Sequence, residues 1–337
     1  MSETLTTNKY PLLIDSFNRK HNYLRISLTD SCNFRCTYCM PDEHQHFLPH
    51  NKLMTSDEIE QLAKIFVNHG VNKIRLTGGE PMVRKDFADI ITRLAKLNVE
   101  LLITTNGSLI HQHIATLIEN GISSVNVSLD SLKPSTFEQL TKRNQFEKVW
   151  NNIQLLLNHN IRIKINAVAI HGKIESEIED FIQLTKHLPI HVRFIEFMPF
   201  TGNHWNKEKV ITADEMLEIV NQNFDTIKLQ DEKHETAKKY KVIGHEGTFA
   251  FITTMSNQFC GECNRLRLTA EGKIKNCLFG KDELDLLEAL RKNEDVSTII
   301  LQSVMSKHAI MGGQFNEGYN YTDASKIVNR SMIEIGG

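Results

Sequence analysis

The chain has 337 residues, of which 24% are charged and 40% hydrophobic, and its formal net charge at pH 7 is −2. A near-neutral charge argues against a general nucleic-acid coat, and no apolar run is long enough to cross a bilayer. The N-terminus lacks the apolar core of a signal peptide, so we expect a cytoplasmic protein whose partners are neither nucleic acids nor membranes. In that compartment cysteines indicate metal binding or catalysis more than disulfides.

A triple-cysteine loop follows the first expected strand. Residues 1–20 form a polar N-terminal extension, and 22–29 alternate as a strand does. Cys32, Cys36 and Cys39 then stand at the spacing C-x3-C-x2-C. Thiolates select soft metals, zinc and iron–sulfur clusters, and three local ligands suggest a four-iron cluster whose fourth iron stays open. A zinc knuckle that borrows a distant His, or buried free thiols, remain alternatives.

Helices and strands alternate through the next part of the chain. The first helix, 56–69, has a capping box between Thr55 and Glu58 and ends at Gly70. Further strands are expected at 72–77, 100–105, 123–129, 161–169 and 191–198, and further helices at 86–97, 109–120, 134–141, 145–159 and 175–187. Units of this kind form a parallel sheet with right-handed crossovers.

Two of these strands carry polar residues on one face. The polar positions are Ser124, Asn126 and Ser128 in one strand and Arg162, Lys164 and Asn166 in the other. Parallel strands that are buried on both faces should be almost wholly apolar. An edge strand that faces water would explain one such strand but less easily both. We therefore expect an α/β fold with an incomplete (β/α)6 barrel and a polar, partly cationic lumen, rather than a doubly wound open sheet.

The pattern changes after Met198. We expect a helix at 212–223, a charged stretch at 225–241, strands at 248–254 and 265–269, a helix at 282–292 and a polar tail. This divides the chain into a barrel of 21–200, a linker region of 201–240 and a smaller C-terminal α+β domain of 241–337.

The C-terminal part contains a second group of three cysteines: Cys260, Cys263 and Cys277. Their spacing, C-x2-C-x13-C, again leaves one position of a metal centre free. A second open cluster and a zinc site completed by His245 are both compatible with it. Arg265 and Arg267 share one face of the following strand, and two guanidinium groups beside a metal centre form an anion site.

Two segments resemble the signatures of the radical S-adenosylmethionine (SAM) enzymes. One is the first cysteine loop, with Tyr38 before its last cysteine, and the other is Thr77-Gly78-Gly79-Glu80-Pro81. The resemblance implies a partial (β/α)6 barrel and a [4Fe-4S] cluster on the first three cysteines. SAM would bind the open iron, and the glycines would let backbone carbonyls approach its amino group.

A more specific resemblance covers nearly the whole chain, from Leu24 to Gly337. It is carried by the first cysteine loop, by the sequence CGECNRLRL at 260–268 and by the terminal Gly-Gly. These segments resemble the GTP 3′,8-cyclase family, lyases that open molybdenum cofactor biosynthesis. The resemblance implies a second [4Fe-4S] cluster, on the C-terminal cysteines, that binds the guanine of GTP. An adenosyl radical would remove the hydrogen at ribose C3′, and the C3′ radical would add to guanine C8 to give (8S)-3′,8-cyclo-7,8-dihydro-GTP.

The same resemblance assigns roles to single residues. It implies GTP contacts for Arg25, Lys73, Arg75, Thr104, Lys164, Arg193, Arg265, Leu266 and Arg267. It implies SAM contacts for Tyr38, Gly79, Ser128 and Met198, and catalytic roles for Arg265, Arg267, Gly336 and Gly337. Solvated strand ends would explain Lys164 and Arg193 equally well, and a frayed chain end would explain the two glycines.

The nature of the partners follows from these assignments. The chain has no G-x4-G-K-[ST] segment, so cationic side chains must hold the triphosphate of GTP. The resemblance also implies an electron donor and a downstream cyclic pyranopterin monophosphate synthase that takes the product, and it leaves monomer and homodimer open. Two other classes remain: a different radical SAM enzyme with an auxiliary cluster, such as a peptide-modifying maturase, and a zinc-binding interaction module.

Overall fold

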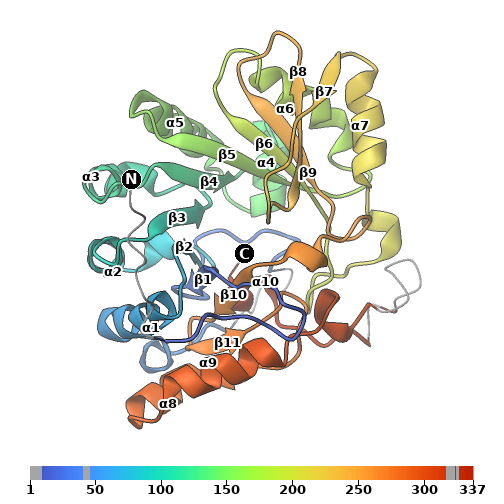
Figure 1. The fold of residues 1–337 in the computed structure, drawn as a ribbon. Helices are drawn as coiled ribbons and strands as arrows, with labels where there is room; N and C mark the ends of the chain where they lie inside the picture. Colours follow the sequence, from blue (N-terminus) through green and yellow to red (C-terminus); the bar gives the residue numbers. More distant parts are fainter. Residues whose placement is uncertain (1–9, 41–45, 316–322, 324–325, 337) are drawn as a thin grey trace, which may run out of the picture.

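A single twelve-stranded sheet runs through the protein (Figure 1). The computed structural model describes residues 10–40, 46–315, 323 and 326–336. Within that part of the chain the strand order is β12-β11-β10-β1-β2-β3-β4-β5-β6-β9-β8-β7. No described helix is both long and apolar enough to cross a membrane.

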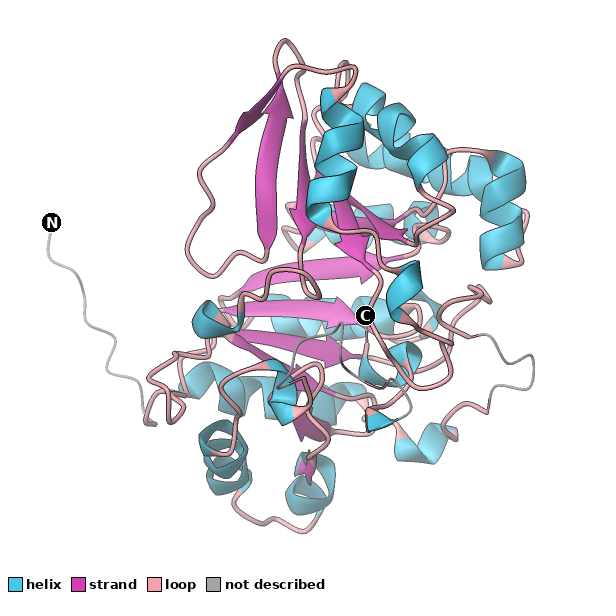
Figure 2. Ribbon diagram, turned by 90° about the vertical axis from the view of Figure 1, so that its right-hand side faces the viewer, coloured by secondary structure: helices cyan, strands magenta, loops and turns pink. Residues whose placement is uncertain are grey.

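Six strand–helix units form the centre of this sheet, as predicted. The strands are β1 (Tyr23–Ser27), β2 (Lys73–Thr77), β3 (Glu100–Thr105), β4 (Ser124–Ser128), β5 (Arg162–Ala169) and β6 (His191–Glu196). The helices are α1 (Ser56–Asn68), α2 (Phe87–Ala95), α3 (Ile110–Glu119), α4 (Pro134–Thr141), α5 (Phe146–Asn158) and α6 (Ile178–Leu184). Neighbouring strands of this set pair in parallel. The helices pack on the outer side of the strands (Figure 2), so the inner side of the curved sheet is left for a ligand.

The alternation of side chains along the strands explains this arrangement. In β5, Ile163 and Ile165 are buried against the helices, whereas Lys164 and Asn166 are half-buried on the inner face. The capping box of α1 is present: Thr55 N donates to Glu58 Oε2 at 2.8 Å and Glu58 N donates to Thr55 Oγ1 at 3.2 Å. Its apolar stripe, which includes Phe66, lies in the core.

The C-terminal part extends the sheet at both edges. β9 (Thr248–Ile252) pairs in parallel with β6, and β10 (Arg265–Leu268) pairs in parallel with β1. Because both strands run in the same direction, the segment 253–264 returns from the carboxyl end of β9 to the amino end of β10. That segment therefore bridges the two edges of the parallel strands, and it carries two of the cysteines. The division at 201–240 stays a prediction, since the sheet continues across it.

The remaining elements lie outside the six units. They are α7 (Ala213–Asn221), β7 (Thr226–Lys228), β8 (Ala237–Val242), β11 (Lys273–Lys275), β12 (Leu284–Asp285), α8 (Leu286–Arg291), α9 (Val296–Met305) and α10 (Met332–Ile335). Short 3-10 turns are η1 (His50–Lys52), η2 (Pro81–Val83), η3 (Glu175–Glu177), η4 (Lys207–Lys209), η5 (Cys260–Glu262) and η6 (Met311–Gly313).

Several predicted elements need correction. The helix expected at 282–292 begins only after the strand β12, because Asp285 caps it by accepting from Glu288 N at 2.8 Å. The expected polar tail contains α9, whose residues Val296, Ile300 and Val304 are buried. The charged stretch at 225–241 contains the antiparallel pair β7 and β8. The N-terminal extension is also packed where the structure describes it, since Leu13 is fully buried.

Candidate active site

A cavity of about 940 Å³ fills the inner side of the curved sheet. The inward-facing side chains of the parallel strands line it, together with all three cysteines of the second group. The predicted GTP contacts in its lining are Arg25, Lys73, Arg75, Thr104, Lys164, Arg193, Arg265 and Arg267. A smaller cavity of about 610 Å³, whose lining includes Lys52 and Arg291, contains none of the predicted site residues.

The first cysteine loop follows the carboxyl end of β1, and its three thiols are free. Burial raises the pKa of Cys36, and Asp130, Cys39 and Cys32 raise it further by their charge. Burial and Cys32 likewise raise the pKa of Cys39 to about 12. The three thiols of this loop therefore lie within electrostatic range of one another.

Neutral groups donate hydrogen bonds to the sulfur of Cys32. The backbone N–H of Phe34 lies 3.4 Å from Cys32 Sγ, and Asn106 Nδ2 lies 3.8 Å from it. Asn106 Nδ2 also donates to Asn33 Oδ1 at 2.8 Å, which ties the loop to the end of β3.

Backbone-to-backbone packing holds the Gly-Gly-Glu-Pro segment against this loop. Gly78 has a φ of +149°, and a Cβ there would lie 2.5 Å from the carbonyl oxygen of Thr29. A Cβ at Gly79 would lie 2.5 Å from the carbonyl oxygen of Ser31. Side chains are therefore excluded at both positions. The buried carboxylate of Glu80 accepts from Asn106 N at 2.6 Å, so the segment and the loop form one rigid unit.

The residues predicted to contact SAM lie near the carboxyl ends of the strands. Tyr38 donates its hydroxyl to Asp130 Oδ2 at 2.6 Å, just beyond β4. Ser128 ends β4 and is half-buried. Met198 follows β6 and lines the cavity, and both Tyr38 and Met198 pack against the same small apolar cluster.

The second cysteine group lies at the other end of the strands, near their amino ends. Cys263 N donates to Cys260 O at 3.2 Å in the turn η5, and Cys277 follows β11. Burial raises the pKa of Cys260, and the charges of Cys277 and Cys263 raise it further, so these thiols also lie within electrostatic range of one another. His245, considered as a zinc ligand, instead shares a hydrogen bond of 2.8 Å with Thr185.

Cationic groups surround Cys263 in particular. Lys307 Nζ lies 3.6 Å from Cys263 Sγ. Burial raises the pKa of the Cys263 thiol, but the charges of Lys307 and Arg265 lower it below its usual value. Within the described part of the chain, no three His, Cys, Asp or Glu side chains are close enough to share a single metal ion.

A row of arginines lies between the two cysteine groups. Arg25 is opposite Arg267 on one neighbouring strand and opposite Arg75 on the other. Burial lowers the pKa of Arg267 to about 10, with a further contribution from Arg265. Burial and Arg193 lower the pKa of Lys164 to about 8. Cations held so close together in a buried site favour a polyanionic ligand.

Some buried atoms of the half-buried lumen side chains Arg193 and Asn166 have no hydrogen-bond partner among the described residues. Arg193 Nε and Nη2 have no hydrogen-bond acceptor there, and Asn166 Oδ1 has no hydrogen-bond donor there. Buried polar groups are normally paired, so these atoms are available to a ligand in the cavity.

Two predicted GTP residues are placed differently from the rest. Lys73 pairs with Glu100 at 2.9 Å at the amino ends of β2 and β3. The side chain of Leu266 lies in the hydrophobic core, because neighbouring residues of a strand point to opposite faces. Any contact between Leu266 and a ligand in the cavity would therefore have to come from its backbone.

The C-terminal tail is packed beside the arginine row. Arg267 Nη1 donates to the carbonyl oxygen of Gly336 at 2.9 Å. Gly336 has a φ of +81°, and a Cβ there would lie 2.5 Å from Thr77 Oγ1. Burial raises the pKa of the Cys39 thiol and the nearby backbone of Ile333 lowers it, so the tail also lies close to the first cysteine group. Gly337 lies outside the described residues.

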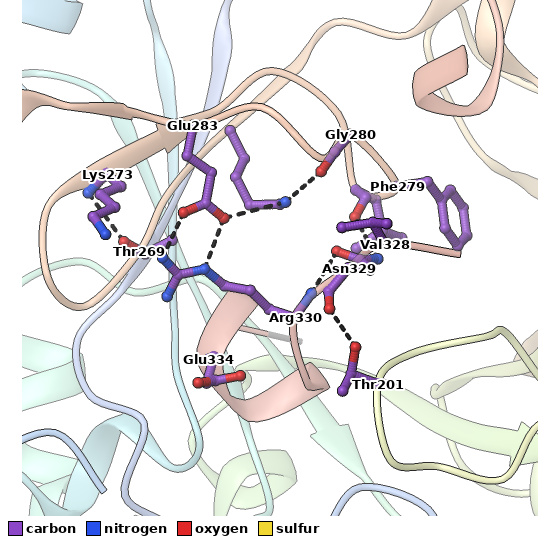
Figure 3. Close-up of polar contacts among 12 residues, drawn as sticks. Thr201, Thr269, Lys273, Phe279, Gly280, Glu283, Val328, Asn329, Arg330 and Glu334 are labelled. Atoms are coloured by element: carbon purple, nitrogen blue, oxygen red, sulfur yellow. Dashed lines mark hydrogen bonds and ion pairs between the residues drawn. The ribbon is translucent and has the colours of Figure 1, made fainter. Parts of the chain in front are cut away.

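An ion-pair network anchors this tail (Figure 3). Arg330 Nε donates to Glu283 Oε1 at 2.7 Å, and Arg330 Nη2 lies 2.5 Å from Glu271 Oε1. Lys275 pairs with Glu283 at 3.3 Å, and Thr201 donates to the carbonyl oxygen of Asn329. These contacts fix the chain just before α10, so the tail enters the lumen from a held position.

Tyr23 is a residue of the lumen that the sequence did not single out. Its hydroxyl accepts from Arg75 Nε at 2.5 Å, and its ring lies under Lys73 and Arg265. Burial raises the pKa of Tyr23, but the charges of Arg75 and Arg25 lower it to about 8. A tyrosine that opens a strand is usually a packing residue, so only the pairing of β1 with β2 and β10 reveals its cationic surroundings.

Two family models match this chain: the Radical SAM superfamily over residues 26–185 and Molybdenum Cofactor Synthesis C over residues 190–311. The chain is 45% identical over 333 residues to a protein of Arabidopsis thaliana named "GTP 3′,8-cyclase, mitochondrial", covering 97% of this chain and 84% of that one. It is 38% identical to the "GTP 3′,8-cyclase" of Alkaliphilus oremlandii, covering 96% and 99% respectively.

Other relatives are longer than this chain. It is 44% identical to the human "Molybdenum cofactor biosynthesis protein 1" and spans 51% of that protein's length. Among solved structures, Streptococcus suis SuiB superposes with a TM-score of 0.62 at 15% identity, covering 88% of this chain and 68% of that one. That likeness shows the fold alone.

Proposed function

Since this chain belongs to the GTP 3′,8-cyclase family of the radical SAM superfamily, we propose that its lumen holds GTP between two [4Fe-4S] clusters. The family acts in molybdenum cofactor biosynthesis, and its membership implies GTP as substrate, SAM and a [4Fe-4S] cluster. The observation that carries the proposal is the row Arg267, Arg25 and Arg75, which lies in one cavity with the second cysteine group.

The donor sets fit both clusters. Each group offers three free thiols, the number that leaves one iron of a four-iron cluster open. Cys32, Cys36 and Cys39 would hold the first cluster, and Cys260, Cys263 and Cys277 the second. When bound, the first cluster and SAM supply one-electron radical chemistry, and the second offers an open iron to the guanine base.

The residues at the carboxyl ends of the strands would hold SAM. Gly79 packs without a side chain against the backbone of Asp30 and Ser31 and would offer its backbone carbonyl to the amino group of SAM, and Gly78 allows the tight turn before it. Tyr38, held by Asp130, would fix the loop beneath the cofactor, and Ser128 and Met198 would line its adenosyl end. Closed packing around this end would exclude water from the reacting atoms.

The cationic groups would bind and orient the nucleotide. Arg267, Arg25 and Arg75 would neutralise phosphate oxygens along one wall, and Lys164 and Arg193 would do so along the opposite wall. Arg265 stands beside Cys263 and would hold the end of GTP nearest the second cluster. By fixing both ends, the site would present ribose C3′ toward the SAM end, which is the orienting contribution that a protein makes to radical chemistry.

Anaerobic incubation with SAM, dithionite and one nucleotide at a time, followed by mass analysis, tests this function. We expect a product of GTP alone, (8S)-3′,8-cyclo-7,8-dihydro-GTP, and iron and acid-labile sulfide sufficient for two clusters. Stoichiometric zinc without sulfide would contradict the clusters. A product from a peptide but from no nucleotide would favour the maturase alternative, which rests on likeness of fold.

The remaining expectations concern partners and location. We propose that an electron donor reduces the first cluster and that a cyclic pyranopterin monophosphate synthase takes the product. The cytoplasmic location, the choice between monomer and homodimer and the domain boundary stay predictions.

A further inference from the structure

A buried lysine lies directly behind the second cysteine group. Lys307 follows α9 and is 3% exposed. Its Nζ lies 3.6 Å from Cys263 Sγ and donates to the carbonyl oxygen of Arg265 at 3.0 Å. One ammonium therefore joins a cysteine of the second group to the strand that carries Arg265 and Arg267.

The charge of Lys307 has no carboxylate partner among the described residues. Lysine is almost never buried without a negative partner. Asp15, the carboxylate of the N-terminal segment, is engaged by Arg19 at 2.6 Å and by His21 at 3.0 Å. The anionic group within reach of Lys307 is the sulfur of Cys263, so the lysine is placed for a thiolate that carries a metal centre.

The surroundings of Lys307 are held rigidly from both sides. Arg19 donates to the carbonyl oxygens of Cys260 at 2.9 Å, Ala309 at 2.8 Å and His308 at 2.8 Å. The backbone N–H of Met311 lies 3.4 Å from Cys260 Sγ. Residues 307–311 and the N-terminal segment therefore form a continuous outer layer around the second group, outside the cysteine motif itself.

The cation beside the first cysteine group, Arg35, donates to the carbonyl oxygen of Cys32 at 2.6 Å rather than to a sulfur. Where the structure describes hydrogen bonds to Cys32 Sγ, the donors are the backbone of Phe34 and the amide of Asn106, both neutral. Hydrogen bonds and charges at the sulfurs are among the factors that set the reduction potential of an iron–sulfur cluster. A positive charge beside one sulfur favours the reduced, more negative state of the cluster.

We propose that Lys307 is a positioning residue of the second cluster. The ammonium of Lys307 raises the reduction potential of this cluster and fixes the position of the cluster relative to Arg265 and Arg267. The inference rests on the proposed function, since it requires a cluster at Cys260, Cys263 and Cys277. It adds a residue outside the cysteine and arginine motifs, and it makes the two clusters electrostatically unequal.

Redox titration of the anaerobically reconstituted full-length protein, monitored by electron paramagnetic resonance, tests the proposal. Lys307→Met removes the charge at similar length, and Lys307→Arg keeps it. We expect Lys307→Met to favour the oxidised second cluster by about tenfold, a shift of about 59 mV to more negative potential for one electron. The potential of the first cluster should not move and serves as an internal reference.

Lys275 supplies a matched control, because it is also buried, at 1% exposed, but pairs with Glu283 rather than with a cysteine. Lys275→Met should leave the reduction potential of the second cluster unchanged. Lys307→Arg should shift that potential much less than Lys307→Met does. If the Lys307→Met protein lacks the iron of one cluster while the Lys307→Arg protein keeps it, this result also supports the proposal, because the second cluster then requires the positive charge.

Three outcomes would overturn the inference. An unchanged potential in a Lys307→Met protein that holds both clusters removes the electrostatic role and leaves the proposed function intact. Loss of the second cluster in both Lys307 variants would indicate packing alone. Iron for only one cluster in the unsubstituted protein would instead refute the two-cluster proposal and this inference together.

Discussion

At the scale of single residues, the lumen contains three cations, Lys164, Arg265 and Arg267, that form no ion pair with a carboxylate in the described part of the chain. Lys164 lines it from β5, and Arg265 and Arg267 line it from β10. Replacing any one of them with Ala should weaken GTP binding by about 1.5–3 kcal/mol, roughly ten- to a hundredfold, which is typical for a charge-assisted contact. Calorimetry with GTP and, separately, with SAM measures this, and SAM affinity should change little.

Arg291 offers a control for that series, because it pairs with Glu58 at 2.7 Å and lies outside the lumen. Arg291→Ala should bind GTP like the unsubstituted protein. Unaltered GTP affinity in all three lumen variants would show that the cations do not form the phosphate site.

Tyr23 predicts how GTP binding depends on pH. Its pKa is lowered to about 8, because the charges of Arg75 and Arg25 outweigh the effect of burial. Above that pH the phenolate would neutralise arginines that GTP needs, and bound phosphates would drive the proton back on. GTP affinity should therefore fall as pH rises through about 8. Loss of the Lys164 proton, with a pKa of about 8, acts in the same direction.

Tyr23→Phe separates the two contributions. Phenylalanine keeps the ring under Lys73 and Arg265 but has no proton to lose. The fall in GTP affinity between pH 7 and pH 9.5 should become shallower in this variant, measured by calorimetry at constant ionic strength. An identical slope would assign the whole effect to Lys164 or to other groups.

At the scale of elements, the two cysteine groups occupy opposite ends of the parallel strands and should act separately. Cys36→Ala should abolish SAM cleavage, because the first group would lose a ligand of the cluster to which SAM binds. Cys263→Ala should leave uncoupled SAM cleavage but lose the cyclised product, because only the second group faces Arg265. Chromatography of 5′-deoxyadenosine and of nucleotide products from the same reactions distinguishes these losses. Equal loss of both activities in both variants would indicate one shared structural role.

Local sequence patterns predicted the barrel elements well. Each of the six strand–helix units has its own alternation, stripe or cap, such as the Thr55–Glu58 box. The patterns failed where elements are short or depend on neighbours, as in β7, β8 and β12. The helix α9 was missed although Val296, Ile300 and Val304 are apolar, because it lies in a tail otherwise rich in polar residues.

Residues of the site were predictable only where a motif marked them. The cysteines and Gly79 stand in recognisable segments. Tyr23 and Lys307 do not, because their surroundings arise from strand pairing and from contacts with residues far away in sequence. The pairing of Arg25 with Arg267, which joins positions near opposite ends of the chain, could not be read from either segment alone.

At the scale of the whole molecule, the C-terminal tail connects parts that are distant in sequence. Arg330 is fixed by Glu283 (Figure 3) and by Glu271, and Gly336 at the end of the tail accepts from Arg267. This arrangement predicts that removing the ion pairs of Arg330 loosens the contact between Gly336 and Arg267. Arg330→Met should lower product formation while iron content stays unchanged, because the anchor lies outside both cysteine groups.

The end of the tail should act on the substrate rather than on folding. Gly336 accepts from Arg267, and Gly337 follows it beyond the described residues. Deleting both glycines should leave iron content and uncoupled SAM cleavage near normal, because α10 and all six cysteines remain. Cyclised product should fall steeply, since Arg267 would lose a contact that holds its guanidinium in place.

Replacing the two glycines with Ala-Ala tests whether the requirement is steric. A Cβ at position 336 would meet Thr77 Oγ1 at 2.5 Å, and the φ of +81° is one that residues with side chains rarely adopt. Ala-Ala should therefore restore product formation poorly, whereas restoring Gly-Gly should do so fully. Product formation by the truncated protein at the full rate would show instead that the glycines are an unused chain end, and that Arg267 needs no help from the tail to orient GTP.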